Sequence, residues 1–262
     1  MMFKGIYAVV LIDLKRFWLD RARIAMGLLQ PLLYLFVLGA GIGSSSQLGG
    51  GRYQQFIFPG VIGLSMLFTA TFAAISIVFD RQIGFFKAVL VAPVPRPAIA
   101  LGKIAAGSLQ AAAQGAIVLP FAPLAGVPVG LLEVLRLIGA MLLASTTFAA
   151  IGLAFASRFK SVTVFPVVSN AVLLPMFFLS GAMYPLTVAP RWMQVAAHFD
   201  PVAYGVDLMR GALSGSYFFS PWLSVAVLVA VITGLAAESV RVLNRGEDDS
   251  SLGSSARVWG RK

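Results

Sequence analysis

Residues 79–103, FDRQIGFFKAVLVAPVPRPAIALGK, join two long uncharged stretches of the sequence and decide how the fold is read. Five charged residues lie in this connection together with three prolines; they are Asp80, Arg81, Lys87, Arg96 and Lys103. The apolar segment IGFFKAVLVA is long enough for about two helical turns. The prolines of PVPRP prevent that helix from continuing. The pattern predicts a short, stiff, partly apolar element between two apolar spans.

The composition places most of the chain in a lipid bilayer. Of 262 residues, 59% are hydrophobic and 11% are charged, whereas soluble domains have about 25% charged residues. The sequence has no cysteine, so it has no disulfide framework and no thiolate metal site. The single histidine, His198, lacks a second His or Cys that would complete a metal site. We therefore expect an all-α polytopic membrane protein that holds no metal and no cofactor of its own.

Six apolar segments are long enough to cross a bilayer, because a hydrocarbon layer of roughly 30 Å needs about 20 helical residues. None of the six contains Asp, Glu, Lys or Arg. The first is longer than the apolar part of a signal peptide, so we interpret it as an uncleaved span. The six predicted spans cover residues 24–42, 56–79, 104–126, 137–156, 162–182 and 218–237.

The distribution of basic residues predicts the orientation of the chain. Sixteen of the 20 Lys and Arg residues fall on the side that holds both termini and residues 80–103; the other side holds Arg52, Arg136, Arg191 and Arg210. Because cytoplasmic loops carry the excess of basic residues, we expect both termini in the cytoplasm and the spans in the inner membrane of the cell. The net charge of +10 is spread over several loops without an RNA- or DNA-reading motif, which excludes nucleic acid as a partner.

The first 23 residues mix aromatic and basic side chains, as a helix at a membrane surface does. Lys15, Arg16, Phe17 and Trp18 carry this pattern. Asp13 falls on the apolar side of the helix, where we expect it to pair with Arg16 three residues later. The alternative is a lead-in segment that only enforces the orientation of the first span.

Polar residues inside the spans must face a partner helix or a cavity, because lipid offers them no hydrogen bond. Gln110 and Gln114 are four residues apart and share one helix face. Asn170 lies between Pro166 and Pro175 in the fifth span, where we expect a bent helix. Helix contact and a place along a substrate path both remain open for the two glutamines and for Asn170.

Residues 183–217 are too short for a soluble domain and too interrupted by prolines to cross the bilayer. We expect short helices that re-enter the outer leaflet before the last span. Polar and aromatic residues are frequent in this segment, among them Trp192, Asp200, Pro201, Tyr204 and Arg210. His198 is interpreted as an interfacial polar residue. Residues 241–262 are rich in Ser and Gly and predict a flexible cytoplasmic tail.

The sequence contains no energy source of its own. The segment LGKI at 101–104 does not match the phosphate-binding pattern GxxxxGK[ST]. The spans have no ionisable residue that could couple transport to protons or cations, and no hydrolase motif accompanies His198. The chain is therefore not predicted to be an enzyme; we expect a helical channel-former or a transporter body whose energy comes from elsewhere. Residues 80–103 are expected to form a cytoplasmic element on which an energy-supplying partner docks. The alternative is a surface helix that only anchors the loop in the membrane interface.

Two segments resemble the ABC-2 type export permeases, in particular the branch for drug and daunorubicin resistance. Residues 79–103 are similar to the family signature F-E-R-x-x-G-x-hh-x-x-L-x-x-x-P-x-x-R-x-x-hhh-G-K. The segment FFLSGAMYPLTVAPRWMQVAAHFDPVAYGVDLMRGAL is similar to FLSG-x-hhP followed by hP-x-W and NP-h-x-Yhhx-hhR. The resemblance covers residues 1–240 as one transmembrane domain. Asp80 stands where the family more often has Glu, and Asp200 stands where it has Asn.

This resemblance implies a division of labour between subunits. Residues 80–96 would be a coupling helix that docks on a separate ATPase subunit, and the residues implied in this contact are Asp80, Arg81, Gly84, Phe85, Pro93 and Arg96. Residues 1–23 would be the interface helix, and residues 183–217 would cap the exit. ATP and Mg²⁺ would bind a pair of partner ATPase subunits, and two permease bodies, a homodimer in preference to a heterodimer, would form one exporter. The implied cargo is a hydrophobic drug or lipid-like amphiphile; the alternatives are a lipid-linked polysaccharide or glycolipid, or a non-transporting assembly or sensor subunit.

Overall fold

The computed structural model describes residues 2–39, 41, 50–82, 96–127, 130–159 and 161–245. Within these ranges the chain is helical and has no β-strand. The expected all-α fold is therefore confirmed for the described residues. The predicted element of residues 83–95 and most of the predicted tail, residues 246–262, lie outside them.

Three long helices form the centre of the bundle. They are α4 (Gly50–Ala73), α7 (Arg96–Val118) and α8 (Leu131–Ala156), and each packs against the other two. Small residues allow the close approach: a Cβ atom added to Gly152 of α8 would lie 2.7 Å from the Cα of Thr71 on α4. The largest buried cluster, which includes Phe58, Met66 and Phe148, joins these helices. Hydrocarbon packing thus continues through the whole centre of the bundle.

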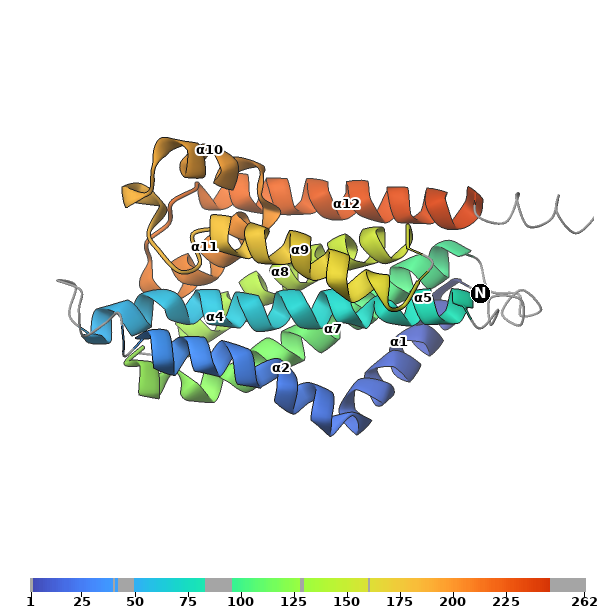
Figure 1. Ribbon diagram of the computed structural model, residues 1–262, viewed down its shortest axis with the longest axis horizontal. Helices are drawn as coiled ribbons and strands as arrows, with labels where there is room; N and C mark the ends of the chain where they lie inside the picture. The colour runs from blue at the N-terminus through green and yellow to red at the C-terminus, as the bar shows by residue number, and fades with distance from the viewer. Residues whose placement is uncertain are drawn as a thin grey trace, which may run out of the picture.

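Four further helices surround this centre (Figure 1). Helix α2 (Arg21–Leu33) packs on α4, and α12 (Pro221–Arg245) packs on α8 and α7. Helix α5 (Ile75–Gln82) follows α4 after a turn at Ala74, and α9 (Val164–Leu179) lies against α4. The start of α1 and the end of α12 lie at the same end of the bundle. This arrangement agrees with an even number of crossings.

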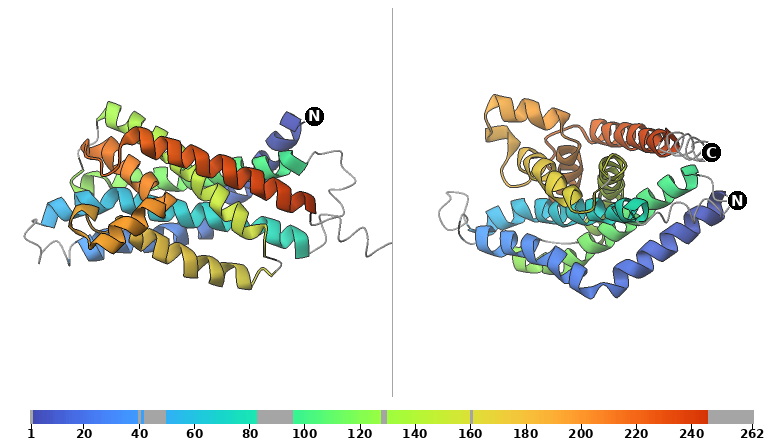
Figure 2. Two further views of the ribbon diagram at one scale, coloured as in Figure 1. Left: turned by 90° about the horizontal axis from the view of Figure 1, so that it is seen from above. Right: turned by 45° about the vertical axis from the view of Figure 1, so that its right-hand side comes forward.

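The N-terminal helix does not continue straight into the first span. Helix α1 (Met2–Leu19) ends at Asp20, whose side chain accepts a hydrogen bond from the backbone N–H of Arg23 and caps α2. The two helices form a V that is open toward the centre of the molecule (Figures 1 and 2). Pro31 lies inside α2, and a π-helical segment, η1 (Tyr34–Leu38), continues the span.

Among the described residues, five helical segments are long and apolar enough to cross a membrane. They are Arg21–Leu38, Tyr53–Phe79, Pro97–Phe121, Leu131–Ala156 and Pro221–Val242. The fifth predicted span, residues 162–182, corresponds to α9, which has 16 residues and is about 24 Å long. It is shorter than a roughly 30 Å hydrocarbon layer, so six full spans are not confirmed. Several helices begin before the predicted spans; α7, for example, starts at Arg96 and not at Ile104.

The end of the bundle opposite the termini is closed by short elements. The 3-10 helix η4 (Leu186–Val188) is followed by α10 (Arg191–Phe199) and α11 (Pro201–Ser214), which precede α12. Gly181 and Gly215 have φ angles of 73° and 71° and supply the left-handed turns before η4 and after α11. Short helices before the last span are therefore observed. Their position in the outer leaflet stays a prediction.

Candidate functional site

Three of the predicted coupling residues lie where α5 ends and α7 begins, at the end of the bundle that also holds the start of α1 (Figure 2). Asp80 and Arg81 are in the last turn of α5, and Arg96 is the first residue of α7. The predicted loop of residues 80–103 is thus wrong at its C-terminal end, because residues 96–103 are helical. Gly84, Phe85 and Pro93 lie outside the described residues.

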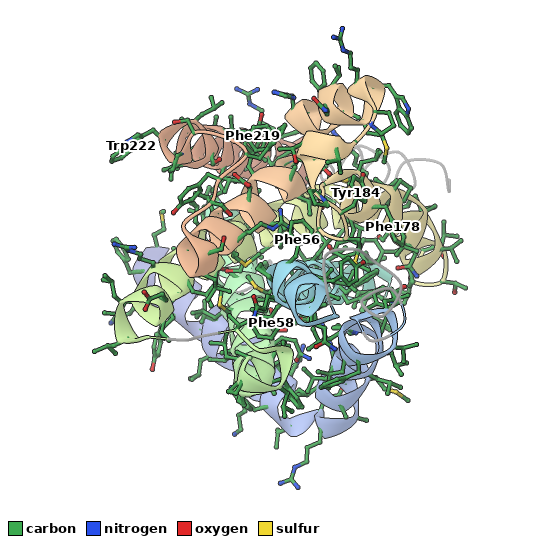
Figure 3. The ribbon with its side chains drawn as sticks, turned by 90° about the vertical axis from the view of Figure 1, so that its left-hand side faces the viewer. Phe56, Phe58, Phe178, Tyr184, Phe219 and Trp222 are labelled. Atoms are coloured by element: carbon green, nitrogen blue, oxygen red, sulfur yellow. The ribbon has the colours of Figure 1, made fainter. Side chains whose placement is uncertain are left out.

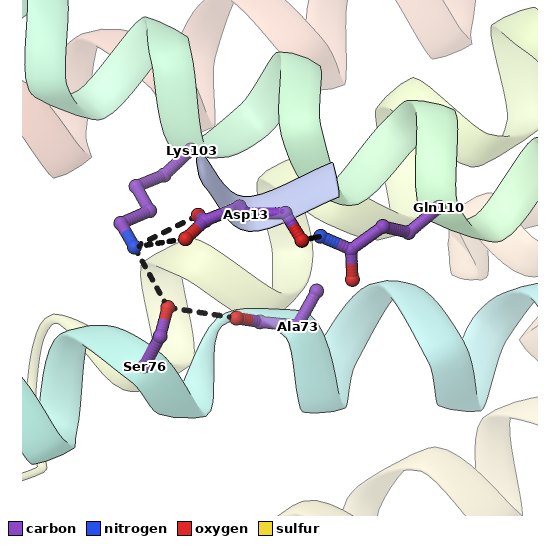
Figure 4. A network of polar contacts seen from close by, with 5 residues as sticks. All are labelled: Asp13, Ala73, Ser76, Lys103 and Gln110. Atoms are coloured by element: carbon purple, nitrogen blue, oxygen red, sulfur yellow. Dashed lines mark hydrogen bonds and ion pairs between the residues drawn. The ribbon is translucent and has the colours of Figure 1, made fainter. Parts of the chain in front are cut away.

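A buried ion pair joins three helices next to this loop (Figure 4). The ammonium group of Lys103 on α7 lies 2.8 Å from Asp13 Oδ2 on α1 and 3.1 Å from Asp13 Oδ1. It also donates a hydrogen bond of 2.9 Å to Ser76 Oγ on α5, and Ser76 donates to the carbonyl of Ala73. Sequence reasoning gave Asp13 a different partner, Arg16. That prediction is wrong, because Asp13 points inward to α7.

The N-terminal helix has one face against the bundle and one face outside it. Gly5, Asp13 and Phe17 are buried on α1, whereas Lys15, Arg16 and Trp18 are exposed. The Trp18 side chain is 54% exposed and meets the Phe17 ring edge to face. Several further apolar side chains point outward, including Phe3, Tyr7, Leu11 and Ile12. An exposed face that mixes apolar, aromatic and basic side chains suits a membrane surface or a partner protein.

Gln110 and Gln114 connect the central helix α7 to the two arms of the V. Gln110 Nε2 donates to the carbonyl of Asp13 at 3.2 Å, and Gln114 Nε2 donates to the carbonyl of Ile24 at 3.1 Å. Their side-chain oxygens are buried and have no partner among the described residues. In this structure the amide nitrogens of both glutamines therefore serve contacts between helices.

Asn170 lies elsewhere, in the wall of a cavity between α2, α4 and α9. The cavity has a volume of about 470 Å³. Residues of three helices line it: Arg23, Met26, Gly27, Gln30, Pro31, Ser65, Phe68, Thr69, Phe72, Asn170 and Leu174. Sequence reasoning identified Asn170 but missed Arg23, which it counted only as one of the orientation charges.

Arg210 holds the opposite end of the bundle together. Its Nη2 donates to the carbonyl of Gly181 at 2.9 Å, and its guanidinium carbon lies 4.1 Å from the centre of the Phe56 ring on α4. Burial lowers the pKa of Arg210 to about 10, while Asp207 acts in the opposite direction, so Arg210 stays charged at neutral pH. The Asp207 carboxylate accepts from the backbone N–H groups of Phe218 and Phe219. Asp207 was missed from the sequence, because its partners follow 11 and 12 residues later.

Asp200 begins α11 as its N-cap residue, with Pro201 in the first helical position. Asp200 Oδ1 accepts a hydrogen bond of 2.9 Å from Val202 N–H, and Oδ2 is buried and has no partner among the described residues. Burial raises the pKa of Asp200 to about 7, although the hydrogen bond from Val202 opposes this shift.

Several aromatic side chains lie at this end of the bundle, among them Tyr184, Phe219 and Trp222 (Figure 3). Tyr204 donates to the carbonyl of His198 at 2.8 Å and stacks on Phe219 with 4.3 Å between ring centres. Trp192 and Trp222 are largely exposed, at 65% and 85%. Aromatic rings of this kind are frequent at the level of lipid headgroups.

The comparisons with known proteins agree with this architecture. A family model for the ABC-2 type transporter matches residues 4–214. This chain belongs to the ABC-2 type transporter family. It is 32% identical over 239 residues to Nodulation protein J of Rhizobium leguminosarum bv. viciae, with 86% of this chain and 87% of that protein covered. It is 27% identical over 248 residues to the inner membrane transport permease YadH of Escherichia coli strain K12, with 93% and 94% covered.

Membership in the ABC-2 family makes the chain a membrane transport subunit rather than a catalytic one. The family's transport subunits work with separate ABC ATPase subunits. Among the described residues no group of three or more His, Cys, Asp or Glu could hold a metal ion.

Proposed function

We propose that this ABC-2 chain is the permease subunit of an ATP-driven exporter, and that its cargo is a drug or lipid-like amphiphile taken from the cytoplasm or the inner leaflet. The Asp13–Lys103 ion pair carries the proposal. It ties α1, α5 and α7 together beside the segment that joins α5 to α7. A displacement of that segment by a partner ATPase is therefore passed to three helices at once.

The cargo class is supported by the lining of the cavity between α2, α4 and α9. Phe68 and Phe72 form a stacked pair with 6.0 Å between ring centres, and Asn170, Thr69 and Gln30 add polar groups to the same lining. Aromatic faces beside amide and hydroxyl groups also suit a sugar-bearing lipid, which keeps glycolipid export as the second candidate. A molecule with one apolar and one polar part fits this lining better than a purely apolar one.

The test uses the full chain reconstituted with a candidate partner ABC ATPase. In inside-out vesicles, ATP hydrolysis should drive uptake of fluorescent amphiphiles, and uptake should stop without nucleotide. Gly84→Glu combined with Phe85→Glu should abolish ATPase binding and uptake together, because both residues lie in the proposed contact. Val188→Glu is the matched control, since Val188 is 78% exposed at the opposite end. Full uptake by the double variant would exclude residues 80–96 as the coupling element, and ATP hydrolysis without uptake of any amphiphile would favour a sensor subunit.

A further inference from the structure

The cavity between α2, α4 and α9 has one positive charge in its lining and no negative charge. Of its lining residues only Arg23 is ionisable. The two acidic groups that act on Arg23 are already engaged: Asp20 accepts from the Arg23 backbone N–H, and Asp13 pairs with Lys103. Both carboxylates still attract the guanidinium group, but neither lies in the lining of the cavity, where Arg23 is the one charged residue.

Two polar atoms of the lining lack hydrogen-bond partners. Arg23 Nη2 and Asn170 Oδ1 are both buried, and neither has a partner among the described residues. A buried donor on a charged group costs more when it is unpaired than a neutral one does. An anionic oxygen that enters the cavity meets the guanidinium group, and a side-chain rotation then gives Nη2 its missing acceptor. A hydroxyl group of the same ligand supplies the donor that Asn170 lacks.

The rest of the lining suits a longer, apolar part of the same ligand. Phe68, Phe72 and Leu174 contribute apolar walls beside Ser65 and Thr69. A volume of about 470 Å³ is within the range of sites for small organic ligands and far above the roughly 30 Å³ of one water molecule. Met26, on the α2 side of the cavity, is 71% exposed. The cavity is therefore reached from the outer surface of the bundle, where lipid lies in the membrane.

We propose that this cavity binds an amphiphile with an anionic headgroup that carries at least one hydroxyl group, through Arg23 and Asn170, with its apolar part along Phe68, Phe72 and Leu174. The headgroup then lies at the first turn of α2, beside the turn that joins α1 to α2 (Figure 1). Such a ligand is either a resident membrane lipid or the exported cargo. Only the second identification rests on the proposed function.

Binding is tested with the purified full chain alone, without an ATPase. Fluorescent phosphatidylglycerol serves as the anionic, hydroxyl-bearing probe and phosphatidylcholine as the reference. We expect the wild-type chain to bind phosphatidylglycerol at least fivefold more tightly than phosphatidylcholine. Arg23→Gln should remove this preference. Arg21→Gln removes one positive charge two residues away, at an exposed position of the same helix. This variant should keep at least half of the preference for phosphatidylglycerol.

A second variant tests whether a loss of binding in Arg23→Gln reflects the lost charge or a folding defect. Asn170→Asp adds a negative charge to the lining without removing Arg23, and should weaken phosphatidylglycerol binding at least fivefold while phosphatidylcholine binding stays within twofold. Equal effects of Arg21→Gln and Arg23→Gln, or no preference in the wild-type chain, would overturn the proposal.

The two sources of the ligand are separated by adding the ATPase and ATP to vesicles. Net movement of phosphatidylglycerol between leaflets, lost in Arg23→Gln, identifies the site as a cargo site. Selective binding without movement identifies a resident lipid, and the anion site stands in both cases. Failure of transport with retained selective binding contradicts the proposed function alone.

Discussion

Lys103 and Asp13 form an ion pair across 90 residues of sequence, with 2.8 Å between Lys103 Nζ and Asp13 Oδ2 and with both side chains only 9% exposed. Each charge is accepted in this place because the other neutralises it and because Ser76 gives the ammonium group a further acceptor. The consequence is that α1 cannot leave α7 without exposing a charge to an apolar surrounding.

Removal of one partner of this pair should destabilise the protein strongly. Lys103→Met leaves the Asp13 carboxylate buried and unpaired, which costs about 3–5 kcal/mol. Thermal unfolding in nanodiscs measures the loss, and Asp13→Asn combined with Lys103→Met should restore part of it. Arg158→Gln is the matched control, because the Arg158–Glu238 pair is 56% and 42% exposed and contributes about 0–1 kcal/mol. Equal losses in Lys103→Met and Arg158→Gln would contradict the role of the buried pair.

Asp200 should make the outer helices sensitive to pH. Its pKa is raised in the folded state to about 7 from an ordinary value of 3.8, so the carboxyl group of the unfolded chain releases its proton first as the pH rises. The contribution of Asp200 to stability is therefore most favourable below about pH 4, falls between pH 4 and pH 7, and stays lower above pH 7, by at most about 4 kcal/mol. Hydrogen exchange of residues 201–214 at pH 5 and pH 8 measures this change. Asp200→Asn keeps a good N-cap and should reduce the pH dependence, with the raised pKa of Asp207 as the remaining source. An unchanged profile in Asp200→Asn would show that another group titrates.

Glycine at position 152 should be required for the contact between α8 and α4. The Cβ atom of Gly152→Ala would lie 2.7 Å from Thr71 Cα, so the two backbones must separate at a cost of about 1–3 kcal/mol. Gly139→Ala is the control on the same helix, because its Cβ meets no atom within 4 Å and alanine favours a helix by up to about 1 kcal/mol over glycine. The two substitutions should thus change the melting temperature in opposite directions, and a shift of the same sign would be incompatible with the close contact.

Arg210 should be required to keep the end of the bundle opposite the termini closed. Arg210→Met removes the donor to the Gly181 carbonyl, the contact with the Phe56 ring and the positive charge beside Asp207. We expect a loss of about 3 kcal/mol, because buried polar groups remain without partners. Protease sensitivity at residues 180–190 and thermal unfolding both report it. Arg191→Met, an exposed arginine on α10, should leave both measurements unchanged; a similar effect there would point to charge alone.

The sequence predicts the helices well and their contacts poorly. Apolar length locates all six segments, since each predicted span overlaps a long helix or α9. The ends of the spans are predicted less well, because charged residues were assumed to lie outside them. The predicted third span begins after Lys103, whereas α7 carries this lysine inside the bundle beside Asp13. No local pattern indicates a partner 90 residues away.

The same limit applies to the polar residues of the spans. The four-residue spacing of Gln110 and Gln114 places them correctly on one face. That they reach two different helices depends on the turn at Asp20, which separates Asp13 from Ile24. Arg23 looked like one of many basic residues near the N-terminus, and only the packing of α2, α4 and α9 gives it an enclosed position.

The wall that α2 gives to the cavity consists of two unequal parts. Up to Gln30 it is a regular helix that Gln114 binds at the carbonyl of Ile24. From Pro31 onward one backbone donor is missing and a π-helical turn follows over Tyr34–Leu38, and such turns weaken the regular ladder of hydrogen bonds. The first membrane span therefore has an N-terminal part that is fixed to α7 and a C-terminal part that can bend at Pro31. A bend at Pro31 widens the cavity at that residue while Arg23 keeps its position.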